Sequence, residues 1–365
     1  MKLIYILFFV FTFSSLCHGQ QISLVTTLES FIEESSGLIY LDGKLITHND
    51  SGGNPTLYEL DDVSGNITRS VVIENATNTD WEDICHDDAY IYIADFGNNS
   101  GTRNDLKIYR LPISDYLTTP NDTVTADTIN FSYLDQTNFT PSTFSTNFDA
   151  EAIISCNDSL FIFTKNWGNN WTNIYALPKT PGTYQIEKID SIDVQGLITG
   201  GSYDDTENIV LLSGYTFAYP FVVEINGFSS TDFSDGTVNR YLLDTPSGSS
   251  IQIEGITHLQ ANEYYLTAEE HFSGNPSLYK LEQSTINIDA LYLKKACIYP
   301  NPTSNYIELK GIDFSVVEIY DAAGILRKTS HNPSIQIADL TRGVYFLTAK
   351  DSKGKMIFSK KLMIQ

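Results

Sequence analysis

The sequence predicts an all-β chain, and three observations lead to that prediction. Short runs of alternating apolar and polar residues, rich in Tyr, Ile, Val and Phe, are separated by turns of Gly, Asn, Asp and Pro. A similar segment recurs five times between residues 21 and 290, and the charge balance changes near residue 290. We therefore expect two β-rich units, one after the other along the chain.

The first twenty residues, "MKLIYILFFVFTFSSLCHGQ", have one Lys, an apolar stretch and a short polar end. This pattern is typical of a secretory signal peptide, so residues 1–20 are expected to be removed on export. No later segment approaches about 18 consecutive apolar residues, so no membrane-spanning helix is expected.

Residues 21–290 contain the fivefold repeat. Each unit has an apolar run, a polar turn and a later strand of the type "LYxL", which together make up about one four-stranded propeller blade. The units begin at "ESSGLIYLDGKLITHNDSGG", "DWEDICHDDAYIYIADFGNN", "DAEAIISCNDSLFIFTKNWGNN", "TGGSYDDTENIVLLSGY" and "IEGITHLQANEYYLTAEEHFSG". We expect a five-bladed β-propeller in which the N-terminal strand "ISLVTTLES" completes the last blade. A sixth blade within residues 113–147 stays open as an alternative.

One position near the start of each repeat carries a potential ligand. The first strand of a propeller blade lines the central channel, so the residues at this position form a ring: Ser36, Glu82, Glu151, Ser202 and Glu254. Three carboxylates that converge raise one another's pKa unless a cation lies between them. Oxygen ligands without His or Cys favour Ca²⁺. Two alternatives remain: the glutamates accept backbone N–H groups instead, or Thr199 or a backbone carbonyl takes the place of Ser202.

This order of residues resembles the calcium-activated nucleotidases (apyrases). The segments "ESSGL", "DWEDI", "DAEAI" and "IEGI" carry the resemblance, which implies a five-bladed propeller with an axial Ca²⁺ held by the same residue types. The loops "THNDSGG" and "IADFGNN" depart from that family's basic and Gly-rich nucleotide-handling segments. The resemblance therefore bears on fold and metal more than on reaction.

Polar residues at the ends of the second strands are candidates for chemistry. His48, Asp95 and Lys165 are expected on the face where the blade loops gather, and could act as general acids and bases near a metal. Polar residues also end strands for purely structural reasons. The chain contains no GxSxG, HExxH or GxxxxGK[ST] motif.

Cys85 and Cys156 follow the equivalent glutamates of two neighbouring repeats. Export permits a disulfide between them, and two buried apolar thiols are the alternative.

The last 75 residues form a separate unit. Alternating runs around Ile307, Ile319 and Phe346 are separated by turns and predict a small Ig-like β-sandwich over residues 291–365. The ordered motifs "YPNP", "YDxxG" and "LxxGxY", followed by a basic final strand, resemble the C-terminal sorting domain of the type IX secretion system of Bacteroidetes. The resemblance implies that residues 291–365 engage the type IX secretion machinery, and that the chain is displayed on the cell surface or released.

The two units carry opposite net charges. Residues 291–365 hold 11 Lys/Arg and 6 Asp/Glu, a net charge of +5, so the rest of the chain, with 11 and 39, has −28. An acidic body disfavours nucleic acid and anionic membranes as partners and is compatible with divalent cations. The expected function is a secreted ligand-binding or scaffold propeller with an axial Ca²⁺. The alternative is a metal-dependent extracellular hydrolase of phosphate or ester bonds.

Overall fold

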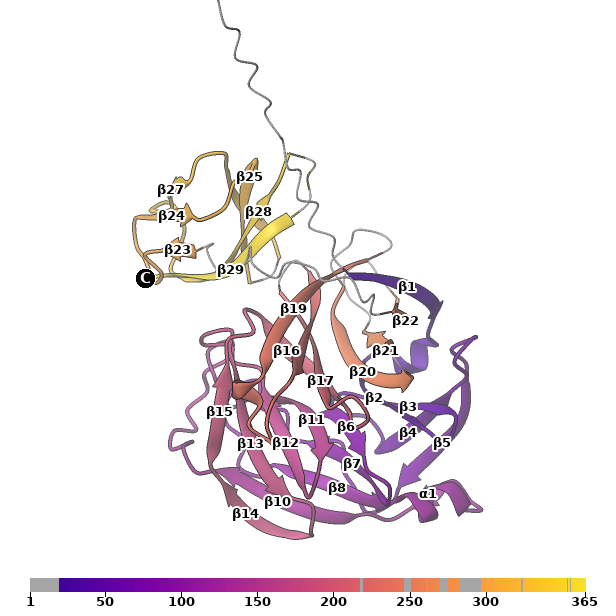
Figure 1. Ribbon diagram of the computed structural model, residues 1–365. Coiled ribbons are helices and arrows are strands. Elements are labelled where there is room, and N and C mark those ends of the chain that lie inside the picture. Colours follow the sequence, from indigo (N-terminus) through magenta and orange to yellow (C-terminus); the bar gives the residue numbers. More distant parts are fainter. Residues whose placement is uncertain are drawn as a thin grey trace, which may run out of the picture.

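A computed structural model describes residues 20–365 except 217–218, 246–250, 261, 270–274, 283–296, 323, 353 and 355 (Figure 1). The predicted signal peptide, apart from Gln20, and the expected unit boundary at residue 290 lie outside the described residues. No helix in the described part of the chain is long and apolar enough to cross a membrane.

The body contains five groups of four strands, and the strands of each group pair antiparallel with their neighbours. The groups are β2(Ser35–Leu41), β3(Lys44–Asn49), β4(Thr56–Leu60) and β5(Ile67–Ile73); β6(Trp81–His86), β7(Tyr90–Asp95), β8(Lys107–Pro112) and β10(Asp127–Tyr133); β11(Ala150–Cys156), β12(Ser159–Thr164), β13(Thr172–Pro178) and β15(Lys188–Ile192); β16(Leu197–Asp204), β17(Ile209–Tyr215), β18(Pro220–Asn226) and β19(Thr237–Asp244); and β20(Ile253–Gln260), β21(Glu263–Ala268), β22(Ser277–Glu282) and β1(Gln20–Thr27). In the part of the chain that the structure describes, three short helices lie in connections: η1(Ser30–Ile32), α1(Ile113–Thr118) and η2(Phe233–Asp235).

The first strands of the five groups form a closed ring. β2 contacts β6, β6 contacts β11, β11 contacts β16, β16 contacts β20, and β20 contacts β2. The N-terminal strand β1 pairs antiparallel with β22 and so supplies the outer strand of the last group, as the sequence predicts. The same strand also meets β19 in a short parallel pairing at Gln20 and Leu243. The body is therefore propeller-like.

Residues 113–147 form no separate four-stranded sheet. They contain α1, the two-residue strand β9(Thr123–Val124) and β10. β9 extends the first group beside β5, and β10 is the fourth strand of the second group. β14(Gly182–Ile186) adds a further strand beside β10. The alternative of a sixth blade in this segment therefore has no counterpart in the fold.

Apolar side chains fill each junction between neighbouring groups. One buried cluster lies at each of the five junctions, since the alternating inward residues of one sheet face those of the next. Cys85 belongs to the cluster between the second and third groups, and Cys156 to the cluster between the third and fourth. Both are buried free thiols, so the alternative of a disulfide between them is wrong.

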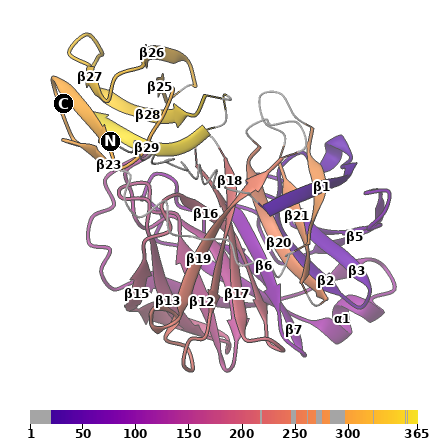
Figure 2. The same ribbon diagram turned by 45° about the horizontal axis from the view of Figure 1, so that its top comes forward.

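The C-terminal unit has two antiparallel sheets around one core. One sheet has the order β23(Cys297–Tyr299), β24(Tyr306–Lys310) and β27(Ser334–Gln336); the other has β26(Leu326–Ser330), β25(Val316–Asp321), β28(Gly343–Lys350) and β29(Met356–Ile364). Buried residues of both sheets, among them Ile307, Ile319 and Leu347, form the shared core. In both views β29 is the strand of this unit that lies nearest the body (Figures 1 and 2).

Candidate functional site

Every first strand of the ring has a β-bulge near its start. The pairing with the second strand skips one or two residues in each of the five groups: Ser36 and Gly37, Glu82, Glu151, Thr199, and Glu254 and Gly255. A bulge redirects the side chain of the extra residue away from the regular alternation. The bulges therefore place polar residues at equivalent positions of five neighbouring strands.

Four of the five residues predicted for the ring lie at these bulges, and Ser202 does not. Ser202 pairs regularly with Leu211, and its Oγ accepts a hydrogen bond from the backbone N–H of His258 at 3.1 Å. Thr199 occupies the bulge, and its Oγ1 donates to the Ile253 carbonyl at 2.7 Å. The fourth position of the ring thus belongs to Thr199, the alternative that the sequence leaves open.

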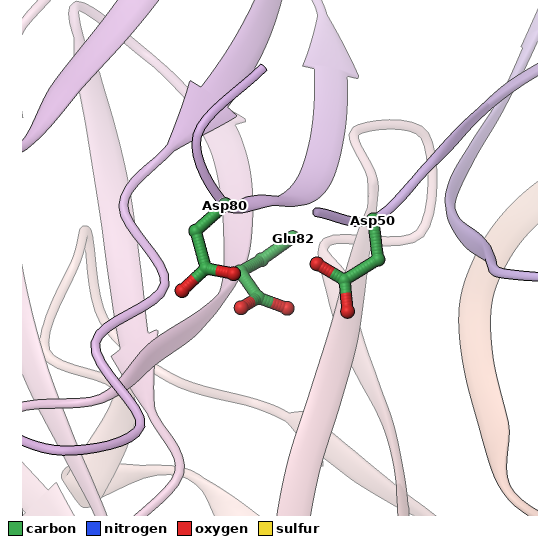
Figure 3. A group of neighbouring side chains, drawn as sticks. All are labelled: Asp50, Asp80 and Glu82. Carbon is green, nitrogen blue, oxygen red and sulfur yellow. The ribbon is translucent and has the colours of Figure 1, made fainter. Parts of the chain in front are cut away.

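Glu82 belongs to two sets of three neighbouring carboxylates. In each set, one oxygen from every member lies within 4.8 Å of the others: Asp50, Asp80 and Glu82 form the first set, and Glu82, Asp149 and Glu151 the second. In Figure 3 the carboxylate of Asp50 approaches those of Asp80 and Glu82, which come from one other stretch of backbone. We call these five residues the acidic cluster.

Asp80 and Asp149 share a sequence signal. Each stands two residues before a bulge glutamate, in "DWE" and "DAE", so the repeat contains D-x-E twice. The residues before the last bulge glutamate are Gln252 and Ile253, and Gln252 Nε2 donates to Glu254 Oε1 at 2.8 Å. In each D-x-E segment the aspartate and the glutamate therefore lie at the same end of the first strand. The D-x-E pattern could have identified Asp80 and Asp149, which are not among the five residues predicted for the ring.

Burial and mutual repulsion make the acidic cluster unfavourable as a set of bare anions. Burial, and then the charges of Glu151 and Asp50, raise the pKa of Glu82 well above its usual range. Burial and the neighbouring Asp80 raise the pKa of Asp50 to about 8, and burial and Asp149 raise that of Asp80 to about 6. Glu82 Oε1 and Asp50 Oδ1 are buried and accept no hydrogen bond within the described structure.

One ammonium group partly balances these charges. Lys165 Nζ lies 3.0 Å from Glu151 Oε1, and the rings of Trp167 and Tyr215 face it with centroids at 5.2 and 5.3 Å. Asp149 is held in place by donors on both oxygens: the Asn98 N–H at 2.7 Å and the Trp167 Nε1–H at 2.7 Å.

The three residues predicted for catalysis do not gather. Lys165 contacts the acidic cluster through Glu151, and Asp95 Oδ1 accepts the backbone N–H of Asp80 at 3.2 Å. Asp95 is fully buried in an ion pair with Arg103 at 2.9 Å, with Lys107 at 3.6 Å. His48 packs edge-on against Trp81, with ring centroids 5.5 Å apart, and burial lowers its pKa to about 4. The imidazole is therefore neutral at physiological pH.

The residues fit a hard divalent cation. The acidic cluster offers carboxylate oxygens from several segments, two of them without hydrogen-bond donors, and such oxygens are the ligands that Ca²⁺ and Mg²⁺ prefer. Glu82, Glu151, Asp50, Asp80 and Asp149 would hold the ion, whereas Ser36 and Thr199 direct their hydroxyls at backbone carbonyls.

Comparison with known proteins gives a family match for the C-terminal unit and distant structural likenesses over most of the chain. Residues 297–365 match the family described as secretion system C-terminal sorting domain. No match is found among curated protein sequences. Among solved structures, PorZ, a surface component of the type-IX secretion system of Porphyromonas gingivalis, is 12% identical with a TM-score of 0.33. The match covers 91% of this chain and 52% of PorZ, so the chain spans about half the length of that protein.

Two enzymes are similar over 73% of this chain. A GH43_1 enzyme from Xanthomonas citri is 11% identical, with 73% of this chain and 91% of that chain covered and a TM-score of 0.42. A gluconolactonase from Xanthomonas campestris is 12% identical, with 73% and 95% covered and a TM-score of 0.33. Neither likeness bears on activity. The family match does assign the tail: residues 297–365 are a secretion-system C-terminal sorting domain, and the chain is exported across the outer membrane to the cell surface or beyond.

Proposed function

We propose that the body is a five-bladed β-propeller that binds Ca²⁺ at the acidic cluster and serves, after export, as a ligand-binding or scaffold module. The observation that carries the metal proposal is the position of Glu82, which belongs to both sets of carboxylates and has an oxygen without a donor. A cation there relieves the repulsion that otherwise raises the pKa of Glu82. The five strand groups, their closed ring of first strands and the N-terminal strand in the last group support the blade count.

The charges around the acidic cluster favour a binding role over a reaction on an anionic substrate. Lys165 is paired with Glu151, and Arg103 lies between Asp95 and Asp105, at 2.9 and 3.0 Å. These cations are thus engaged by the protein's own carboxylates. The net charge of −28 outside the tail also repels phosphate esters at long range.

A metal-dependent hydrolase of phosphate or ester bonds is the second proposal. Asp50 and Asp80 are only half-buried, so part of the site faces solvent, which a purely structural ion does not need. A bound divalent cation would supply Lewis-acid chemistry. Of the predicted catalytic residues, Lys165 contacts Glu151 of the cluster and Asp95 accepts the Asp80 N–H, whereas His48 packs against Trp81. The Lys165 ammonium would stabilise negative charge that develops on the substrate.

Calcium titration of residues 21–365, followed by thermal unfolding, tests both proposals. We expect Ca²⁺ at about 100 times its Kd to add about 2.7 kcal/mol to the free energy of unfolding, a rise in Tm of about 4–5 °C. The Asp80→Asn/Glu82→Gln variant should lose this response. Asp88→Asn, an exposed aspartate two residues past β6, should keep it.

Hydrolysis of a nucleotide and of a simple ester, measured in the same samples, separates the two roles. Calcium-dependent turnover that disappears in Asp80→Asn/Glu82→Gln would establish the hydrolase, whereas a Tm response without turnover supports the binding module. A wild-type Tm that does not respond to Ca²⁺ would exclude the metal site.

A further inference from the structure

Lys361 of the sorting domain reaches into the body. This residue of β29 is 8% exposed. Its Nζ donates to the carbonyl of Phe144 at 2.7 Å and also to the carbonyl of Trp167. Both acceptors belong to the body, so the ammonium lies at a junction between the two units, on the side where β29 faces the body (Figures 1 and 2).

The body holds the two carbonyls in place by contacts of its own. Phe144 lies in the connection before β11 with φ at +57°, and its ring meets that of Trp167 edge-on, with centroids 5.0 Å apart. Trp167 follows β12, and its indole N–H donates to Asp149 of the acidic cluster at 2.7 Å. Two separate connections thus direct acceptors at one point. A primary ammonium, which carries three donors and no acceptor, matches that arrangement.

The sorting domain fixes the backbone of Lys361 equally well. Lys361 pairs with Phe346 in the β28–β29 ladder. The Asn301 side chain donates to the Lys361 carbonyl at 2.7 Å and accepts from the Met363 N–H at 2.8 Å. Asn301 belongs to the "YPNP" motif, so that motif holds the segment that presents the lysine.

The charge of Lys361 survives its burial at neutral pH. Removal from water lowers the pKa of Lys361 to about 8, so most molecules keep the ammonium at pH 7. A buried charge is costly unless acceptors replace the lost water, and the two carbonyls do so. The opposite net charges of the two units, +5 and −28, add long-range attraction.

We propose that the carbonyls of Phe144 and Trp167 form a binding site for a lysine ammonium group, and that Lys361 fills it to hold the sorting domain on the loop face of the body. The acidic cluster lies on the same face, joined to the site through the Trp167–Asp149 hydrogen bond. Occupation of the site by Lys361 does not require the proposed metal, because no cluster carboxylate contacts Lys361 Nζ among the hydrogen bonds and ion pairs of the described residues.

Hydrogen exchange of residues 21–365 in metal-free buffer tests this site. In Lys361→Gln we expect peptides covering residues 142–148 and 165–168 to exchange about tenfold faster than in the wild type, since a hydrogen bond to a charged group is worth about 1.5–3 kcal/mol and 1.4 kcal/mol is a factor of ten. The neighbouring Lys360→Gln, whose side chain is only partly buried, is the matched control and should leave both peptides unchanged. Equal exchange in all three proteins overturns the proposal.

Peptides from β28 report whether the sorting domain stays folded in Lys361→Gln. If they lose protection, small-angle scattering of the wild type decides the question without a variant. A single compact particle supports docking, and a distance distribution of two separated bodies overturns it. Neither measurement involves Ca²⁺, so failure of the metal proposal leaves this result unaffected.

Discussion

Lys165 and Glu151 form a buried ion pair, with Nζ 3.0 Å from Oε1, at the centre of a group of carboxylates. Burial disfavours the charge of Lys165, but attraction to Glu151, and also to Glu254 and Asp149, outweighs it and raises the pKa of Lys165 well above its usual range. The body therefore carries an internal cation next to the proposed metal site, and the ammonium and a metal ion stabilise the same carboxylates.

Replacing Lys165 by Met should expose the role of this internal cation. Removing one partner of a buried ion pair leaves the other charge uncompensated, so we expect the free energy of unfolding in chelator to fall by about 3–5 kcal/mol. Urea denaturation measures the loss, and saturating Ca²⁺ should restore part of it. The control Lys188→Met changes an exposed lysine of β15. A loss no larger than that of the control would contradict the counterion role.

The stability of the metal-free protein should fall as pH rises from 5 to 8. Burial and neighbouring charges raise the pKa of Asp50 from 3.8 to about 8 and, with burial dominant, that of Glu269 from 4.5 to about 7. The folded protein thus holds protons at Asp50 and Glu269 that the unfolded chain has already lost, and the free energy of unfolding decreases across this range. In chelator we expect Tm to drop by on the order of 5 °C between pH 5 and pH 8.

Saturating Ca²⁺ should reduce this drop, because the ion takes the place of the protons. Asp50→Asn should flatten the pH profile in chelator. A Tm that rises from pH 5 to pH 8 by the same amount with and without Ca²⁺ would contradict the assignment.

The fivefold repeat predicts the ring of polar residues on the first strands. The β-bulge in the fourth first strand is not visible in the sequence, so the sequence does not identify the fourth residue of the ring. Glu82 and Glu151 stand in clear apolar runs, where alternation fixes the register of the strand. The fourth repeat reads "TGGS". Its two glycines have no side chain that would show which face of the strand is buried, so the sequence does not distinguish Ser202 from Thr199 as the residue that faces the channel. The bulge between Ile198 and Gly200 selects Thr199.

The catalytic prediction assumed that polar residues at the ends of the second strands lie close together. Successive side chains of a strand point to opposite faces of the sheet, so residues at equivalent strand ends can face different neighbours. His48 turns toward Trp81 of the next group, whereas Asp50, two residues later and beyond the strand, reaches the acidic cluster. The pairing of Asp95 with Arg103 joins a strand end to the following loop. The contact of Lys361 with Phe144 spans 217 residues, and no local pattern predicts a contact of that separation.

A methyl group at Gly37 should disrupt the ring of first strands. A Cβ there would lie 2.5 Å from the Ile84 nitrogen and 2.7 Å from the Asp83 Cα, and these backbone atoms of β6 cannot move aside as a flexible side chain does. We expect Gly37→Ala to lower the free energy of unfolding by at least about 1–3 kcal/mol. In Gly53→Ala the nearest atom, Asn78 Nδ2, is 4.0 Å away, and urea denaturation should show little change. Equal effects would mean that β2 and β6 are not closely packed.

Asp83→Asn should loosen the ring by removing a shared acceptor. Asp83 Oδ2 accepts the N–H of Ile153 at 2.9 Å and that of Gly201 at 3.0 Å, so one buried carboxylate joins first strands of three neighbouring groups. An amide offers a single acceptor oxygen, whereas Oδ1 also accepts the Ile84 N–H at 2.8 Å, and at least one donor is left unsatisfied. We expect the free energy of unfolding, measured in urea, to fall by about 1–3 kcal/mol, and hydrogen exchange to accelerate at one or more of Ile84, Ile153 and Gly201. Asp88→Asn controls for the loss of one negative charge. Unchanged exchange at all three amides would show that the carboxylate does not tie the strands together, whatever the change in overall stability.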